Sequence, residues 1–186
     1  MKKILITCQG INEQDNYLKG DIKEAGGLPY DKIIFIDSEE HLARKSPFGI
    51  WDKFGDWFLG VYGEKYKIIA EEILKQLDSL QEEGVQIDLL GHSFGSIPIL
   101  YSFLKSSVHI NKCYLIGSPL TARAFFVRNA AKRVFEGLIK GKVQGLVFCY
   151  NNKDHISCKP YKFAEENRYI GDGHDSVNYL KELKFH

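Results

Sequence analysis

The sequence predicts an α/β fold, a three-layer sandwich in which a mostly parallel sheet of five or six strands lies between two layers of helices. Short apolar runs alternate with amphipathic stretches along the chain, the order typical of parallel strands joined by helical crossovers. Residues 33–36 read Ile-Ile-Phe-Ile, a continuous run typical of a strand that helices cover on both faces. With 186 residues, the chain is expected to form one domain spanning 1–186.

The composition and charge of the chain argue against several classes of protein. Hydrophobic residues make up 44% and charged residues 26% of the chain, as in ordinary globular proteins. The formal charge of +1 argues against a nucleic-acid partner bound through bulk electrostatics. No apolar run approaches the ~18 residues of a membrane-spanning helix, and the run at 4–8 ends too early for a signal peptide. We therefore expect no nucleic-acid partner and no stable membrane insertion.

The four cysteines lack the C-x-x-C spacing of metal and redox sites. Cys8, Cys113 and Cys149 fall inside predicted strands, where a free cysteine behaves as a small buried apolar residue. The chain also lacks the H-E-x-x-H spacing of zinc enzymes, and the glycines near Ser93 lack the Lys-Ser/Thr pair of a phosphate loop. We expect a cytoplasmic protein without a metal or a cofactor.

The first half of the chain predicts a βαβ unit followed by a long helical connection. The unit comprises a strand over 3–8, a helix over about 15–25 and a strand over 32–37. In the connection over 38–84, aromatic and aliphatic side chains recur at helical spacing. Trp51, Trp57 and Phe58 of this stripe are candidates to bind an apolar substrate. The alternative is a helix face that only packs on the sheet.

The second half of the chain continues the alternation of strands and helices. Its predicted elements are a strand over 85–90, a helix over 93 to about 107, a strand over 112–116, a basic helix over 121–140, a strand over 143–150, a weak strand near 168–170 and a closing helix. The basic segment over 121–142 is interpreted as a covering helix with a solvated face. The alternative is a lid or a surface for anionic membranes.

Residues 91–95 form the pattern G-x-S-x-G, with Ser93 at its centre. Because a predicted strand ends here and a helix begins, Ser93 is expected at a sharp turn, in a strained backbone conformation from which its hydroxyl projects. Gly91 and Gly95 then lack side chains where the helix would collide with the strand. The pentapeptide alone is a weak signal, so the rest of the chain must support it.

Four candidate groups lie directly after strands or expected strands: 9–11, Ser93, Asp154 and His174. The carboxyl ends of parallel strands share one edge of a sheet, and ligands bind where the strand order reverses. A serine hydroxyl becomes a nucleophile when a base accepts its proton, and that base needs a carboxylate to orient it and to stabilise its charged form. The placement of these groups therefore favours serine catalysis.

These features resemble a small serine hydrolase of the α/β-hydrolase fold, in a minimal esterase or lipase-like form. The resemblance rests on the motif at 91–95, on the chain order serine, acid, histidine, and on the strand pattern. It implies that Ser93 is the nucleophile, Asp154 the acid and His174 the base.

The resemblance also implies an oxyanion hole formed by the backbone N–H of Phe94 together with that of Ile11 or its neighbour. The chain departs from larger members of the family in three ways. It lacks their first antiparallel strands, it has Gln9-Gly10 where His-Gly is common, and it separates acid and base by only 20 residues. His92 is expected to be structural, because neighbouring side chains on a turn point in different directions.

Other assignments of the acid and the base remain open. Asp154 is alternatively an ordinary turn aspartate, and His174 a residue of a glycine-rich turn. His155 is a rival base, although it directly follows Asp154 and adjacent side chains seldom converge. Asp172 and Asp175 flank His174 and share that difficulty as acids.

The resemblance implies a serine hydrolase, carboxylesterase-like, that cleaves a small-molecule carboxylic ester or thioester through an acyl-enzyme intermediate. The alternative, from a different class, is a catalytically silent binding or scaffold protein of the same fold in which the triad is misaligned.

Overall fold

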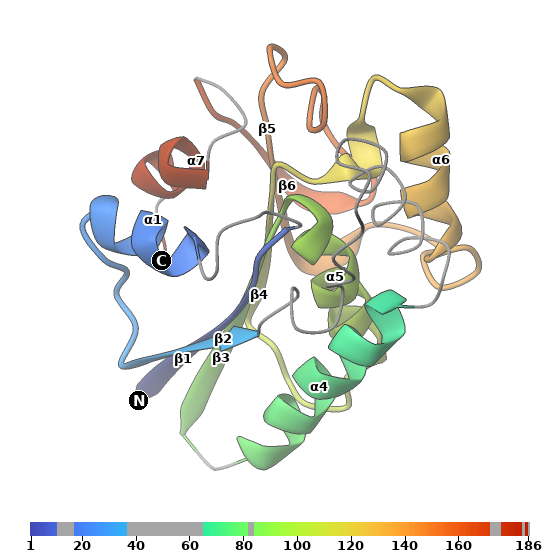
Figure 1. Ribbon diagram of the computed structural model, residues 1–186. Coiled ribbons are helices and arrows are strands. Elements are labelled where there is room, and N and C mark those ends of the chain that lie inside the picture. The colour runs from blue at the N-terminus through green and yellow to red at the C-terminus, as the bar shows by residue number, and fades with distance from the viewer. Residues whose placement is uncertain (11–16, 37–64, 82–83, 172–175, 184, 186) are drawn as a thin grey trace, which may run out of the picture.

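The computed structural model describes residues 1–10, 17–36, 65–81, 84–171, 176–183 and 185, and these residues form a six-stranded sheet with helices on both faces (Figure 1). Every described strand pairing is parallel, and the order across the sheet is β2-β1-β3-β4-β5-β6. The strands are β1 (Lys2–Cys8), β2 (Lys32–Ile36), β3 (Val85–His92), β4 (Lys112–Ile116), β5 (Val143–Tyr150) and β6 (Ala164–Tyr169). The predicted α/β sandwich is confirmed.

The strand order reverses between β1 and β3, which lie side by side near the middle of the sheet. From β1 the chain proceeds outward to β2, and from β3 it proceeds in the other direction to β6. The register pairs Cys8 with Gly91, so both strands end at the same level. The segments that follow these two strands therefore meet at the switch point, where open α/β sheets bind their ligands.

The described helices form one layer on each face of the sheet (Figure 1). They are α1 (Tyr17–Glu24), α4 (Lys65–Ser79), α5 (Ser96–Lys105), α6 (Phe125–Arg133) and α7 (Ser176–Glu182), with 3-10 turns η1 (Ser93–Gly95) and η2 (Pro119–Thr121). Apolar side chains of α4, α5 and α6 pack on one face, and those of α1 and α7 on the other. None of these described helices is long and apolar enough to cross a membrane.

Two elements differ most from their predicted extents. The basic helix expected over 121–140 is shorter, because η2 precedes it, α6 ends at Arg133, and Gly137 in the turn beyond has a φ of +83° that does not continue a helix. The weak strand expected near 168–170 is longer and covers Ala164–Tyr169. The predicted burial of Cys8, Cys113 and Cys149 within strands is confirmed, and burial raises the pKa of the Cys149 thiol to about 12.

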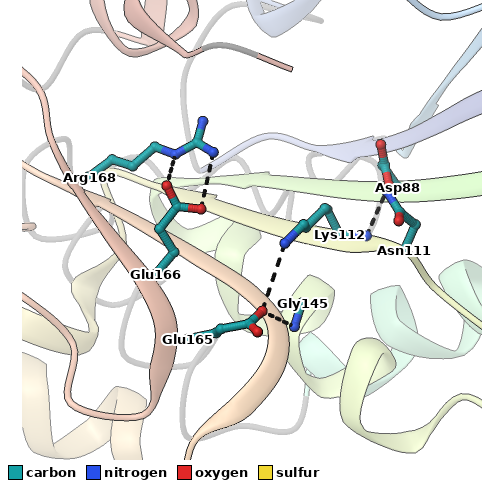
Figure 2. A network of polar contacts seen from close by, with 7 residues as sticks. All are labelled: Asp88, Asn111, Lys112, Gly145, Glu165, Glu166 and Arg168. Atoms are coloured by element: carbon teal, nitrogen blue, oxygen red, sulfur yellow. Dashed lines mark hydrogen bonds and ion pairs between the residues drawn. The ribbon is translucent and has the colours of Figure 1, made fainter. Parts of the chain in front are cut away.

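A buried carboxylate joins the amino-terminal half of β3 to its neighbours. Asp88 accepts hydrogen bonds from the Tyr30 hydroxyl (2.7 Å), from Asn111 Nδ2 (2.8 Å) and from the backbone N–H of Lys112 (2.9 Å). Figure 2 shows the last two residues converging on it. Burial and the Asp88 carboxylate together raise the pKa of Tyr30, so the phenol stays protonated and donates.

We expect Asp88→Ala to lower the free energy of unfolding by about 2–4 kcal/mol, because three donors then lose a buried charged acceptor. Urea denaturation measures this loss. The control is Asp78→Ala at an exposed position of α4, where a change within about 0.5 kcal/mol is expected. Equal effects at the two positions would show that the Asp88 network does not stabilise the fold.

Candidate active site

Ser93 lies at the junction where β3 ends and the turn η1 leads into α5. Its φ is +51°, and among the described residues no other non-glycine has a positive φ. Serine enters the left-handed region at an energetic cost, and such strain persists only where the surroundings impose it, commonly at functional sites. The sharp turn and the strained backbone that the motif predicts at this position are therefore present.

Two glycines allow the turn to pack closely. A Cβ on Gly91 would lie 2.5 Å from Ser96 Cα, and a Cβ on Gly95 would lie 2.3 Å from the carbonyl oxygen of Cys8. Both distances are far shorter than a van der Waals contact with backbone atoms. The expectation that a side chain at either position would cause a collision is confirmed.

Two buried serines, Ser96 and Ser118, stabilise the turn through hydrogen bonds. Ser96 Oγ donates a hydrogen bond to the carbonyl oxygen of Ser93 (2.7 Å) and lies 2.7 Å from Ser118 Oγ. Because a hydroxyl has one proton, Ser118 is the donor in the second contact. This chain of hydrogen bonds ties the turn to the segment after β4.

The segment after β1 packs directly against Ser93. A Cβ on Gly10 would lie 2.7 Å from Ser93 Cβ and 3.2 Å from the Phe94 nitrogen. The Gly10 N–H donates to Tyr17 Oη (2.9 Å), which in turn lies 2.7 Å from His92 Nδ1. His92 is buried with its ring edge-on to Tyr17, in agreement with the structural role expected of it. Sequence reasoning missed Tyr17.

Asp154 lies in the loop after β5, and its side chain is 4% exposed. Its Oδ1 accepts the Ile156 N–H (2.7 Å), and its Oδ2 accepts the Tyr179 hydroxyl (3.0 Å). The loop is closed by backbone bonds from Asp154 N–H to the Asn151 carbonyl and from Asn151 N–H to the Ser157 carbonyl. The carboxylate is thus held in one orientation at the carboxyl edge of the sheet.

Tyr179 connects this carboxylate to the closing helix α7. Burial, followed by the charge of Asp154, raises the pKa of Tyr179, so its phenol donates to the carboxylate rather than ionising. The helical pattern of the sequence marks this segment only as apolar, and no local signal identifies the hydroxyl as a partner of Asp154.

Five of the predicted site residues cannot be compared with the structure. His174, Ile11, Trp51, Trp57 and Phe58 lie outside the described residues.

Phe94 and the rival base His155 lie within the described residues. Phe94 is buried, and its nitrogen would lie 3.2 Å from a Cβ on Gly10. The rival base His155 has an exposed side chain. Within the described ranges, no group of three or more His, Cys, Asp and Glu side chains is placed to hold a metal ion.

Comparison with known proteins identifies the fold. No protein-family model and no curated protein sequence matches the chain. Among solved structures, the chain is similar to a metagenome-derived lipolytic enzyme of the LipS and LipT pair, with a TM-score of 0.56 and 8% identity over 92% of this chain and 84% of that one. It is also similar to a variant of SOBER1 from Arabidopsis thaliana (0.52; 8%; 97% and 96%) and to Est1E from Butyrivibrio proteoclasticus (0.50; 11%; 97% and 86%). The chain has the fold of the small α/β-hydrolases, as its motif suggests.

We expect Gly95→Ala to destabilise the protein by more than about 3 kcal/mol, because the added methyl group meets two backbone carbonyls that cannot move without separating α5 from β1. The backbone of Gly95 is itself helical (φ −58°), so conformational strain does not contribute. Thermal or urea unfolding measures the effect.

Gly20→Ala in α1 is the matched control, because a Cβ there meets nothing within 4 Å. Alanine at this helical position should raise stability by up to about 1 kcal/mol. A Gly95→Ala protein as stable as Gly20→Ala would contradict the packing argument.

Proposed function

We propose that this chain is a serine hydrolase, carboxylesterase-like, that cleaves a carboxylic ester or thioester through an acyl-enzyme intermediate. The observation that carries the proposal is the left-handed backbone of Ser93 at the strand-to-helix turn, on a fold shared with lipolytic enzymes. Strain of this kind at a switch point projects a hydroxyl into the crevice where substrates of α/β proteins bind.

In the proposed reaction, Ser93 Oγ attacks the carbonyl carbon while His174 takes the hydroxyl proton. The tetrahedral intermediate collapses, the alcohol or thiol leaves with the proton held by His174, and an acyl-serine remains. A water molecule then attacks the acyl carbon and loses a proton to His174. That proton passes to Ser93 Oγ as the acyl carbon–oxygen bond breaks, which releases the carboxylic acid and regenerates Ser93.

The negative oxygen of each tetrahedral intermediate requires N–H donors aimed at it. The Phe94 N–H is the first proposed donor, since Phe94 follows the nucleophile and its nitrogen lies beside Gly10, after β1. Gly10 leaves room beside Ser93 but gives its own N–H to Tyr17. This favours the next residue, Ile11, as the second donor.

Asp154 is the proposed acid that orients His174 and stabilises its imidazolium form. The buried carboxylate is fixed by the Ile156 N–H and by Tyr179. Tyr179 belongs to α7, which begins at Ser176, two residues after His174 in the chain. The hydrogen bond from Tyr179 therefore ties Asp154 to the helix that follows the proposed base.

Trp51, Trp57 and Phe58 are proposed to form the apolar lining that binds the acyl group of a small-molecule substrate.

Ser93→Ala should lower the hydrolysis rate of a p-nitrophenyl ester by ~10⁴-fold or more, since only residual stabilisation of the transition state remains. A fluorophosphonate probe should label the parent protein and leave this variant unlabelled, because the probe reacts only with an activated serine. An unlabelled parent that hydrolyses no ester would favour the scaffold alternative.

His174→Ala and Asp154→Asn should each lose several orders of magnitude in kcat, whereas His155→Ala should lose little. Melting temperatures separate these losses from misfolding, since Asp154 is buried. The rate of the parent should rise with pH through a group near the ordinary histidine pKa of ~6.5, because only neutral imidazole accepts the serine proton. An inactive His155→Ala beside an active His174→Ala would reverse the assignment.

A further inference from the structure

Positive charge is concentrated in one stretch of the chain. Residues 121–163, all within the described part, contain nine Lys and Arg and two Asp and Glu, a formal charge of +7. Because the whole chain carries +1, the other 143 residues carry −6. Such asymmetry points to contact with an anionic surface rather than to a uniformly solvated exterior.

Six of these basic residues form what we call the basic face, made by α6 and the flanking segments. They are Arg123, Arg128, Lys132, Arg133, Lys159 and Lys162. Among the ion pairs of the described residues, none involves a member of this face. Burial, and then the charges of Arg128, Lys159 and Lys162, lower the pKa of Lys132. The cations at Arg128, Lys132, Lys159 and Lys162 are thus close enough to repel one another.

Two adjacent aromatic side chains are exposed beside these cations. Phe125 is 67% and Phe126 is 50% exposed in the first turn of α6. The opposite side of the helix, which includes Val127, Ala130 and Ala131, is buried. The Phe125 ring lies 5.5 Å from the Arg128 guanidinium. The helix therefore packs on the sheet with one side and presents phenylalanine and basic side chains to solvent with the other.

The basic face also contains a cavity. A hollow of about 440 Å³ between α6 and the segment at 161–163 is lined by three basic side chains and one acidic one, together with the rings of Tyr161 and Phe163. The charged residues are Lys132, Arg133, Lys162 and Glu136. Its size and its excess of positive charge suit a phosphate-bearing headgroup.

The basic face borders the edge of the sheet that carries the candidate site. The Arg123 N–H donates to the His155 carbonyl (2.9 Å), and the Arg123 guanidinium donates to the Asn152 carbonyl. Both acceptors belong to the loop that holds Asp154. Figure 1 shows the start of α6 and the connection from β5 to β6 at the same end of the molecule.

We propose that the basic face docks on the surface of a membrane that contains anionic lipids, with Phe125 and Phe126 entering the headgroup region and the Lys and Arg side chains contacting lipid phosphates. Exposed aromatic residues next to a basic helical face are the composition of helices that lie in the membrane interface. An acidic protein would match the charge alone, whereas a lipid interface matches the charge and the phenylalanine pair together. The orientation brings the carboxyl edge of the sheet close to the bilayer.

Co-sedimentation of the full chain with vesicles tests the proposal without reference to catalysis. The protein should bind vesicles of mixed phosphatidylglycerol and phosphatidylcholine and ignore vesicles of phosphatidylcholine alone. Binding should weaken strongly between about 0.1 M and about 0.5 M salt, because screening shortens the reach of the surface charges. Ser93→Ala should bind as the parent does, so failure of the proposed hydrolase activity and failure of docking are distinguishable.

Two double variants address the two components of the face. Lys132→Glu with Arg133→Glu should weaken binding by about 30-fold or more, since each basic residue contributes independently at an anionic surface. Phe125→Ser with Phe126→Ser should also weaken binding. The binding that remains should be more sensitive to salt than that of the parent. Both pairs are exposed, and unchanged melting temperatures would show that the fold is retained.

The matched controls lie on other elements. Lys19→Glu with Lys23→Glu changes the same charge on α1, and Ile68→Ser removes an exposed apolar side chain from α4. Both controls should bind almost as the parent does. Equal losses in the controls, or no preference for anionic vesicles, would overturn the proposal. So would a parent that ignores vesicles but binds a polyglutamate peptide, which would assign the face to an acidic protein.

Discussion

The contact between the turn after β3 and the end of β1 is the constraint on which the candidate site depends. Gly95 approaches the carbonyl oxygens of Cys8 and Gln9 so closely that a methyl group does not fit. This approach brings Ser93 against the loop after β1, although the two segments are distant in sequence. It also imposes the left-handed backbone of Ser93, whose cost of about 1–3 kcal/mol must be offset by the surrounding packing. The buried hydroxyl of Ser96 supplies part of that support from within the same turn. Strain and packing at this point are thus two aspects of one arrangement.

The sequence predicts those parts of the fold whose signal is local and apolar. The strands β4 and β5 have the predicted bounds, because each contains a continuous run of buried apolar residues, 113–116 and 146–149. The sequence indicates only the end of the edge strand β6, because its residues are mostly polar. Its pairing with β5 is supported by contacts such as the hydrogen bond from the Gly145 N–H to Glu165 (2.7 Å), which appear only in the folded chain (Figure 2). The amphipathic pattern predicts too long a basic helix, because the pattern continues past Arg133 whereas the helical backbone ends there.

The same distinction applies to the candidate site. The roles of the glycines around Ser93 follow from a five-residue pattern, so the sequence reveals them. Tyr17 and Tyr179 act through hydroxyl groups that reach His92 and Asp154, which lie 75 and 25 residues away in the chain. Periodicity registers a tyrosine as an aromatic member of a helix face and says nothing of where its hydroxyl points. Polar contacts between distant segments therefore appear only in the structure, and one of them, from Tyr179, orients the proposed acid Asp154.

The net charge of the chain conceals a strongly basic region of its surface. A total of +1 argues against electrostatic partners, but the total is the difference between a positive stretch over 121–163 and a negative remainder. Sequence periodicity left open whether the basic helix covers the sheet or meets a membrane. The burial of Val127 and Ala131 shows that α6 covers the sheet, and the exposure of Phe125 on its other side shows that covering does not use all of its apolar surface. The two interpretations are therefore compatible, because a helix has two faces and each can serve a different contact.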